Sequence, residues 1–159
     1  MRDTFFNNDD KIYIHYGHDK FDIVNFKPPR NKYNKPEEFE NIGREVSLYC
    51  NKPVEGFWGS PIDSEYGWNE WRKGNEYRDY NNDSNIKFRV VGDIYYIDSV
   101  EKAYALCDED GWIDWGEVFE YYDAVEVSLT DCPELYDVLY GWDVDSIVVG
   151  NPESIVIVG

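Results

Sequence analysis

Residues 86–97 read IKFRVVGDIYYI and contain two short apolar segments, 86–91 and 94–97, on either side of Gly92 and Asp93. Short runs that are rich in β-branched and aromatic residues and end at turn residues are typical of β-strands. This stretch therefore predicts two consecutive strands. Other segments of similar texture also predict strands, at residues 11–15, 124–128, 146–149 and 154–158.

Few helices interrupt these strands. Ser99 is placed to cap a helix that continues to about Cys107. Asp114, with Glu117 three residues later, forms a capping-box pattern before a second helix that ends near Tyr122. Many short strands with few, separated helices predict an α+β fold with a largely antiparallel or split sheet, not a doubly wound parallel one.

The chain is expected to form a single domain. Its 159 residues lie within the roughly 100 to 200 typical of one domain, and 42% hydrophobic with 18% aromatic residues suffice for a packed core. We expect a polar segment at 1–10 and one domain at 11–159. No apolar run reaches the roughly 18 to 20 residues of a membrane span, and no secretion signal is evident. We therefore expect a cytoplasmic protein without a membrane partner.

Acidic residues dominate the C-terminal half of the chain. Residues 1–89 contain 16 acids and 14 bases, whereas residues 90–159 contain 17 acids and a single base, Lys102. A field of this sign repels nucleic-acid phosphate and anionic membranes, so we expect no direct nucleic-acid binding by this half. Two interpretations stay open: a solvated face that aids solubility, and a surface that mimics nucleic acid to bind a basic protein.

The sequence offers little support for a bound metal. Residues 108–117 match the second part of a calcium loop, but Leu106 stands where the first ligand belongs, and this favours a capped helix start. The two histidines, His15 and His18, lack a third partner, and the three cysteines lack CxxC spacing. We therefore expect no metal cofactor.

Three separate segments carry the candidate site. They are residues 13–17 (YIHYG), 56–60 (GFWGS) and 145–152 (DSIVVGNP). In this order they resemble the ADP-ribosyltransferase fold, in the branch named for its His, Tyr and Glu triad, which includes diphtheria-type toxins and poly(ADP-ribose) polymerases. The resemblance implies split, mainly antiparallel β-sheets with a few short helices, NAD as a substrate, and transfer of ADP-ribose to a macromolecule.

A wider set of motifs points the same way. The combination HYG, GFWGSP, YGWNEW, IDW, YDAVEV and WDVDSIVVGNP is similar to a group of small phage and bacterial proteins, over residues 11 to 157. This second resemblance implies a protein encoded by a phage or mobile element. Its expected target is a host protein or a nucleic-acid-processing protein.

The resemblance to the transferases implies roles for the residues that would bind NAD. The histidine that ends an early strand hydrogen-bonds the nicotinamide ribose in that family, and this role falls on His15. The aromatic position of the second segment falls on Trp58, with Tyr66 as a candidate for the opposite wall of a nicotinamide slot. The candidate cofactor-binding residues are therefore His15, Tyr16, Gly17, Phe57, Trp58, Ser60 and Tyr66.

The third segment departs from the family pattern. Alignment of its strand puts Ser146, not a glutamate, at the catalytic position, and a neutral serine cannot stabilise a cationic ribose as a carboxylate does. Asp145 is one residue earlier, so on a strand its side chain points to the other face. Asp143 lies just outside the strand, and Glu126 could reach in from a neighbouring strand. The candidate catalytic residues are Asp143, Asp145 and Ser146.

Three functions follow as hypotheses. The first is a mono-ADP-ribosyltransferase that uses NAD to modify a host macromolecule, with an aspartate in place of the usual glutamate. The second is a non-catalytic descendant that binds a nucleotide or a protein, for instance as an inhibitor of a host defence system. The third is mimicry of nucleic acid by the acidic C-terminal half.

Overall fold

A computed structural model of the chain describes residues 11–18, 20–32, 52–64, 84–109, 111–135, 139, 142 and 144–158. The predicted polar segment 1–10 and the candidate site residues Tyr66 and Asp143 lie outside the described residues. None of the helices in the described part of the chain has the length and hydrophobicity that crossing a bilayer requires.

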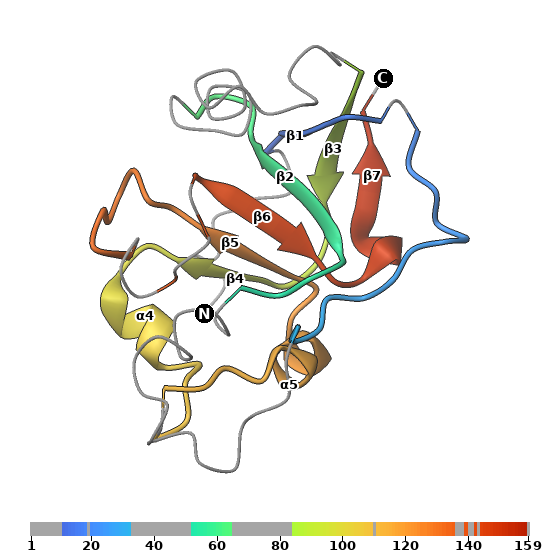
Figure 1. The fold of residues 1–159 in the computed structure, drawn as a ribbon. Coiled ribbons are helices and arrows are strands. Elements are labelled where there is room, and N and C mark those ends of the chain that lie inside the picture. Colours follow the sequence, from blue (N-terminus) through green and yellow to red (C-terminus); the bar gives the residue numbers. More distant parts are fainter. Residues whose placement is uncertain are drawn as a thin grey trace.

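The described strands form one sheet in the order β4-β5-β6-β2-β1-β3-β7 (Figure 1). They are β1 (Tyr13–Tyr16), β2 (Phe57–Pro61), β3 (Asn85–Val90), β4 (Ile94–Ile97), β5 (Ala124–Val127), β6 (Ser146–Val149) and β7 (Ile155–Ile157). Each predicted strand is present, with its ends shifted by at most two residues, and β2 is an additional strand. All neighbouring pairs are antiparallel except β4 and β5, which are parallel. The predicted α+β class with a largely antiparallel sheet is confirmed.

The strand β2 joins two groups of strands through its opposite ends (Figure 1). Its residues 57–59 pair with β6, whereas Ser60 and Pro61 pair with β1. At the crossing, a Cβ atom on Gly59 would lie 2.9 Å from the carbonyl oxygen of Ile14 and 2.8 Å from the ring of Phe88. Only glycine allows this close approach of the two strands.

Two short helices connect the parallel strands β4 and β5. They are α4 (Val100–Tyr104) and α5 (Trp115–Tyr121). As predicted, Ser99 caps α4 by accepting a hydrogen bond from the Lys102 amide, and Asp114 caps α5 by accepting one from the Glu117 amide. A connection of this length is needed because parallel strands cannot be joined by a tight turn. After β6, a single 3₁₀ turn, η3 (Pro152–Ser154), leads into β7.

Two apolar clusters lie on opposite faces of the sheet. Val148 of β6 packs in the larger cluster with Trp115 and Trp142, to which α4 and α5 also contribute; we call this the helix-side cluster. Its neighbours Ile147 and Val149 pack in the second cluster. Because successive side chains on a strand point to opposite faces, membership in a cluster tells which face a strand residue occupies.

Candidate functional site

The three segments that carry the candidate site residues lie on adjacent strands. His15 lies on β1, Trp58 on β2 and Ser146 on β6, and these strands follow one another in the order β6-β2-β1. Residues far apart in the sequence are therefore brought into one continuous part of the sheet. Side-chain directions then decide which of them can act together.

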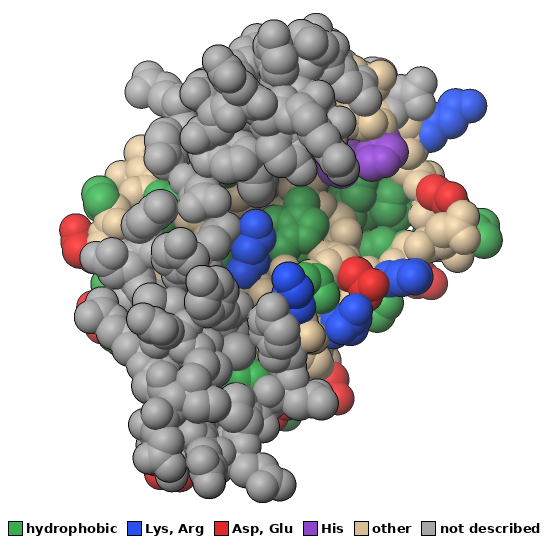
Figure 2. All heavy atoms as spheres, viewed as in Figure 1, with side chains coloured by type: hydrophobic (Ala, Val, Ile, Leu, Met, Phe, Trp, Pro, Cys, Tyr) green, Lys and Arg blue, Asp and Glu red, His purple; other side chains and the backbone are tan. Residues whose placement is uncertain are grey.

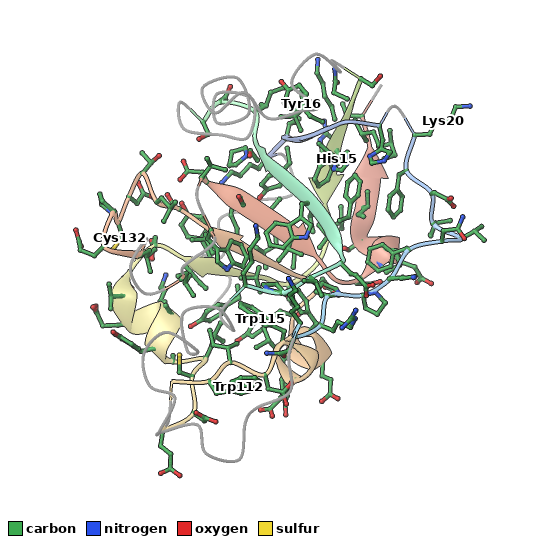
Figure 3. All side chains as sticks on the ribbon, viewed as in Figure 1. His15, Tyr16, Lys20, Trp112, Trp115 and Cys132 are labelled. Atoms are coloured by element: carbon green, nitrogen blue, oxygen red, sulfur yellow. The ribbon has the colours of Figure 1, made fainter. Side chains whose placement is uncertain are left out.

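His15 has a fixed position beside β2 (Figure 3). Its Nδ1 lies 2.7 Å from the Trp58 carbonyl oxygen and its Nε2 lies 2.9 Å from Nδ1 of His18. Because a carbonyl oxygen only accepts, His15 Nδ1 donates and His15 Nε2 accepts from His18. The imidazole also stacks on Phe57 with ring centroids 4.5 Å apart. Burial, opposed by the bond to Trp58 and aided by His18, lowers the pKa of His15.

We expect the free energy of unfolding to fall as the pH drops below about 6.5, the ordinary pKa of histidine. The unfolded chain protonates His15 in this range while the folded chain, with the lower pKa, resists protonation. The loss therefore begins near the unfolded pKa and stops once folded His15 is also protonated. Urea unfolding from about pH 7.5 to 5.5 measures this loss. A His15→Gln variant with an undiminished pH dependence in this range would contradict the assignment.

Trp58 points away from His15. Its Nε1 donates to the Glu55 carbonyl oxygen at 2.7 Å, and its ring packs 4.9 Å from that of Trp142, against the helix-side cluster. Its neighbour Phe57 belongs to the second cluster and contacts His15. The structure therefore brings His15 together with Phe57 rather than with the Trp58 indole.

The remaining described candidates serve the backbone and the core. Gly17 has a φ of +106°, in the region that glycine adopts readily, so the chain can turn after Tyr16. Ser60 is buried on β2. Ser146 is also buried, and its Oγ donates to the Val144 carbonyl oxygen at 2.9 Å. The Ser146 hydroxyl group is therefore already engaged in a hydrogen bond within its own segment.

Asp145 holds two loops against the start of β6. It is buried, and its Oδ1 accepts from the amides of Leu129 and Thr130 at 2.7 and 2.9 Å. Its Oδ2 accepts from the hydroxyl groups of Thr130 and Ser64 at 2.5 and 2.8 Å. Each carboxylate oxygen thus has two donors. This arrangement indicates a structural role for Asp145.

Glu126 is a second buried carboxylate. It lies on β5, is 3% exposed, and accepts hydrogen bonds of 2.6 Å from the Tyr13 hydroxyl group and the Lys11 ammonium. Burial and the Glu126 charge raise the pKa of Tyr13, so this phenol keeps its proton and donates. Glu126 therefore reaches across to β1, on the face of the sheet that also carries His15, two residues from Tyr13.

A cavity of about 400 Å³ opens beside these two carboxylates. Its walls include Lys11, Ser64, Tyr96, Glu126, Thr130 and Asp145. The Tyr96 hydroxyl group donates to Asp131 at 3.0 Å, and burial together with this bond raises the pKa of Tyr96 to about 12. His15, Phe57 and Trp58 do not line this cavity. One feature of the sequence points to this cavity: Glu126 is the single charged residue in the otherwise apolar strand AVEV.

No protein-family model, curated protein or solved structure matches the chain. Among the described residues, no three His, Cys, Asp or Glu side chains gather as a metal site would require. The site offers a fixed imidazole with a stacked phenyl ring and, on the same face, a buried carboxylate at a polar cavity.

Proposed function

We propose that the chain binds NAD and transfers its ADP-ribose group to a macromolecule of a host cell, as a protein encoded by a phage or mobile element. The observation that carries the proposal is the adjacency of β1, β2 and β6. The three segments that resemble the ADP-ribosyltransferases are distant in sequence, yet they occupy three neighbouring strands. A shared ligand site requires such proximity.

His15 and Phe57 are the residues that bind the nicotinamide end in this proposal. Phe57 is itself buried, so in this proposal the nicotinamide ring packs on the His15 imidazole in place of His18, which stacks there in the structure. The bond from His18 to His15 Nε2 is exchangeable because His18 is exposed. When His18 swings away, a ribose hydroxyl group donates to the same nitrogen. The lowered pKa of His15 keeps that nitrogen available as an acceptor.

Glu126 is the acid that supports the reaction in this proposal. Loss of nicotinamide proceeds through an oxocarbenium-like ribose, which a nearby carboxylate stabilises. Among the described acids of the site, Asp145 already accepts four hydrogen bonds, whereas Glu126 accepts two. Glu126 therefore retains lone pairs for a positive charge that develops at the ribose.

Incubation with NAD labelled in its adenylate group and a host lysate tests the proposal. We expect a labelled macromolecule and an equivalent release of nicotinamide. Glu126→Gln should lower the release rate about 100-fold or more while NAD still binds. His15→Ala should weaken NAD binding about tenfold, because a half-buried hydrogen-bonding partner is lost.

The matched control is Glu120→Gln, which makes the same chemical change at an exposed position of α5. It should leave nicotinamide release unchanged. Calorimetry of each variant with NAD separates lost binding from lost turnover. If the unaltered protein shows neither label transfer nor nicotinamide release under any lysate condition tried, the transferase proposal is wrong.

Binding without turnover is the second candidate function. It is favoured by the third segment, where Asp145 is fully hydrogen-bonded and Ser146 is buried. In this form the protein binds a nucleotide or a protein partner, for instance as an inhibitor of a host defence system. Calorimetry that shows binding of NAD or ADP-ribose without nicotinamide release would select it. Mimicry of nucleic acid stays a prediction, for which salt-sensitive binding of a basic protein is the test.

A further inference from the structure

A basic patch lies on one face of this strongly acidic protein. The chain carries a net charge of −18, yet the described segments 27–32 and 52–55 contain four bases and one acid, Glu55. We call the four bases the basic patch: Lys27, Arg30, Lys32 and Lys52. Figure 2 shows blue side chains gathered on one face, around a red acidic group and next to green apolar side chains.

Backbone pairing places the two segments of the patch side by side. The amide of Arg30 donates to the Val54 carbonyl oxygen at 3.1 Å, and the amide of Val54 donates to the Arg30 carbonyl oxygen at 2.9 Å. The Gly56 amide donates to the Lys27 carbonyl oxygen at 2.8 Å. A Cβ atom on Gly56 would lie 2.6 Å from Pro29, so the contact is close. The charges therefore gather because the fold holds their backbones together, despite their mutual repulsion.

Within the basic patch, the charges of Arg30 and Lys27 are only partly neutralised by the described residues. Arg30 is 60% exposed; its Nε donates to Glu55 at 3.1 Å and its Nη1 donates to the Asn31 carbonyl oxygen at 3.3 Å. Its Nη2 has no hydrogen-bond partner among the described residues, and neither has the Lys27 ammonium. The Lys52 ammonium lies 5.3 Å from the centre of the Trp58 ring. One guanidinium nitrogen, Nη2 of Arg30, and the Lys27 ammonium are thus open to a ligand.

We propose that the basic patch binds the phosphate groups of a compact ligand of the nucleoside diphosphate type. Nη2 of Arg30 donates charge-assisted hydrogen bonds to phosphate oxygens, and the Lys27 ammonium adds a point charge. The net charge of −18 repels a long polyanion, whereas the local patch attracts a short one. The inference goes beyond the proposed function, because phosphate binding here does not require that ADP-ribose be transferred.

Calorimetric titration of the full chain at low ionic strength tests this site, with inorganic pyrophosphate, ADP-ribose and a single-stranded oligonucleotide as probes. We expect pyrophosphate and ADP-ribose to bind, and added salt to weaken both. Arg30→Gln and Lys27→Gln should each weaken pyrophosphate binding about tenfold, because each removes one charged donor. Lys87→Gln, an exposed lysine on β3, should leave the affinity unchanged.

Two results would overturn the proposal. One is the same pyrophosphate affinity in the Arg30→Gln, Lys27→Gln and unaltered proteins. The other is tighter binding of the oligonucleotide than of pyrophosphate through these two residues, which would assign the patch to nucleic acid. Pyrophosphate binding without nicotinamide release retains the anion site and counts against the transferase proposal. Nicotinamide release by the unaltered protein, together with unchanged pyrophosphate affinity in both variants, supports the transferase proposal and overturns the anion site.

Discussion

Replacing Asp145 with alanine should lower the free energy of unfolding by about 3 to 4 kcal/mol. The substitution removes the acceptor of four hydrogen bonds, and it leaves the amides of Leu129 and Thr130 without their partner. A buried donor without an acceptor loses its hydration and gains nothing in return. Urea unfolding at neutral pH, with the slope compared between the proteins, measures the change.

Two further variants determine whether Asp145 is structural. Asp145→Asn keeps one carbonyl acceptor for the two amides, and the hydroxyl groups of Thr130 and Ser64 can rotate to accept from the new amide; we expect a loss of about 1 to 2 kcal/mol. Asp63→Ala, at an exposed position, should change stability by less than about 0.5 kcal/mol. A stable Asp145→Asn protein that binds NAD but releases no nicotinamide would instead make Asp145 catalytic.

Elements that depend on local signals could be predicted from the sequence. The caps of α4 and α5 are examples, because Ser99 and Asp114 bond to amides only three residues away. The predicted strands also follow from local runs of apolar residues. The helix α4 ends at Tyr104, earlier than the predicted Cys107, whereas α5 ends at Tyr121, next to the predicted Tyr122.

The strand β2 and the parallel pair β4 and β5 could not be predicted in this way. Residues 57–61 contain Gly59 and Pro61, which local propensity disfavours in a strand. Gly59 is nevertheless required where β2 passes close to Ile14. The direction in which β4 and β5 pair depends on the path of the connection between them. Such information lies in long-range contacts, not in the composition of a segment.

The candidate site was predictable at the level of segments but not of side chains. The segments around His15, Trp58 and Ser146 do meet on adjacent strands. Which aromatic ring faces the histidine depends on the exact register of β2, because a shift of one residue exchanges the two faces. Phe57 therefore contacts His15, and the Trp58 ring joins the helix-side cluster.

Replacing Lys11 with methionine should lower the free energy of unfolding by about 2 to 3 kcal/mol. The Glu126 carboxylate is 3% exposed and would keep only the hydrogen bond from Tyr13. Breaking a buried ion pair from one side leaves an uncompensated charge, which destabilises more than replacing both partners. This value is at or below the lower end of the usual range, because Lys11 is itself 34% exposed.

The double variant Lys11→Met with Glu126→Gln distinguishes this ion pair from simple loss of packing. Glutamine removes the buried charge but still accepts from the Tyr13 hydroxyl group, so the double variant should recover at least about 1 kcal/mol relative to Lys11→Met alone. If the stability losses of Lys11→Met and Glu126→Gln add up to that of the double variant, the ammonium and the carboxylate do not stabilise one another. In that case Glu126 is held in place by Tyr13, and the cavity keeps its carboxylate without help from Lys11.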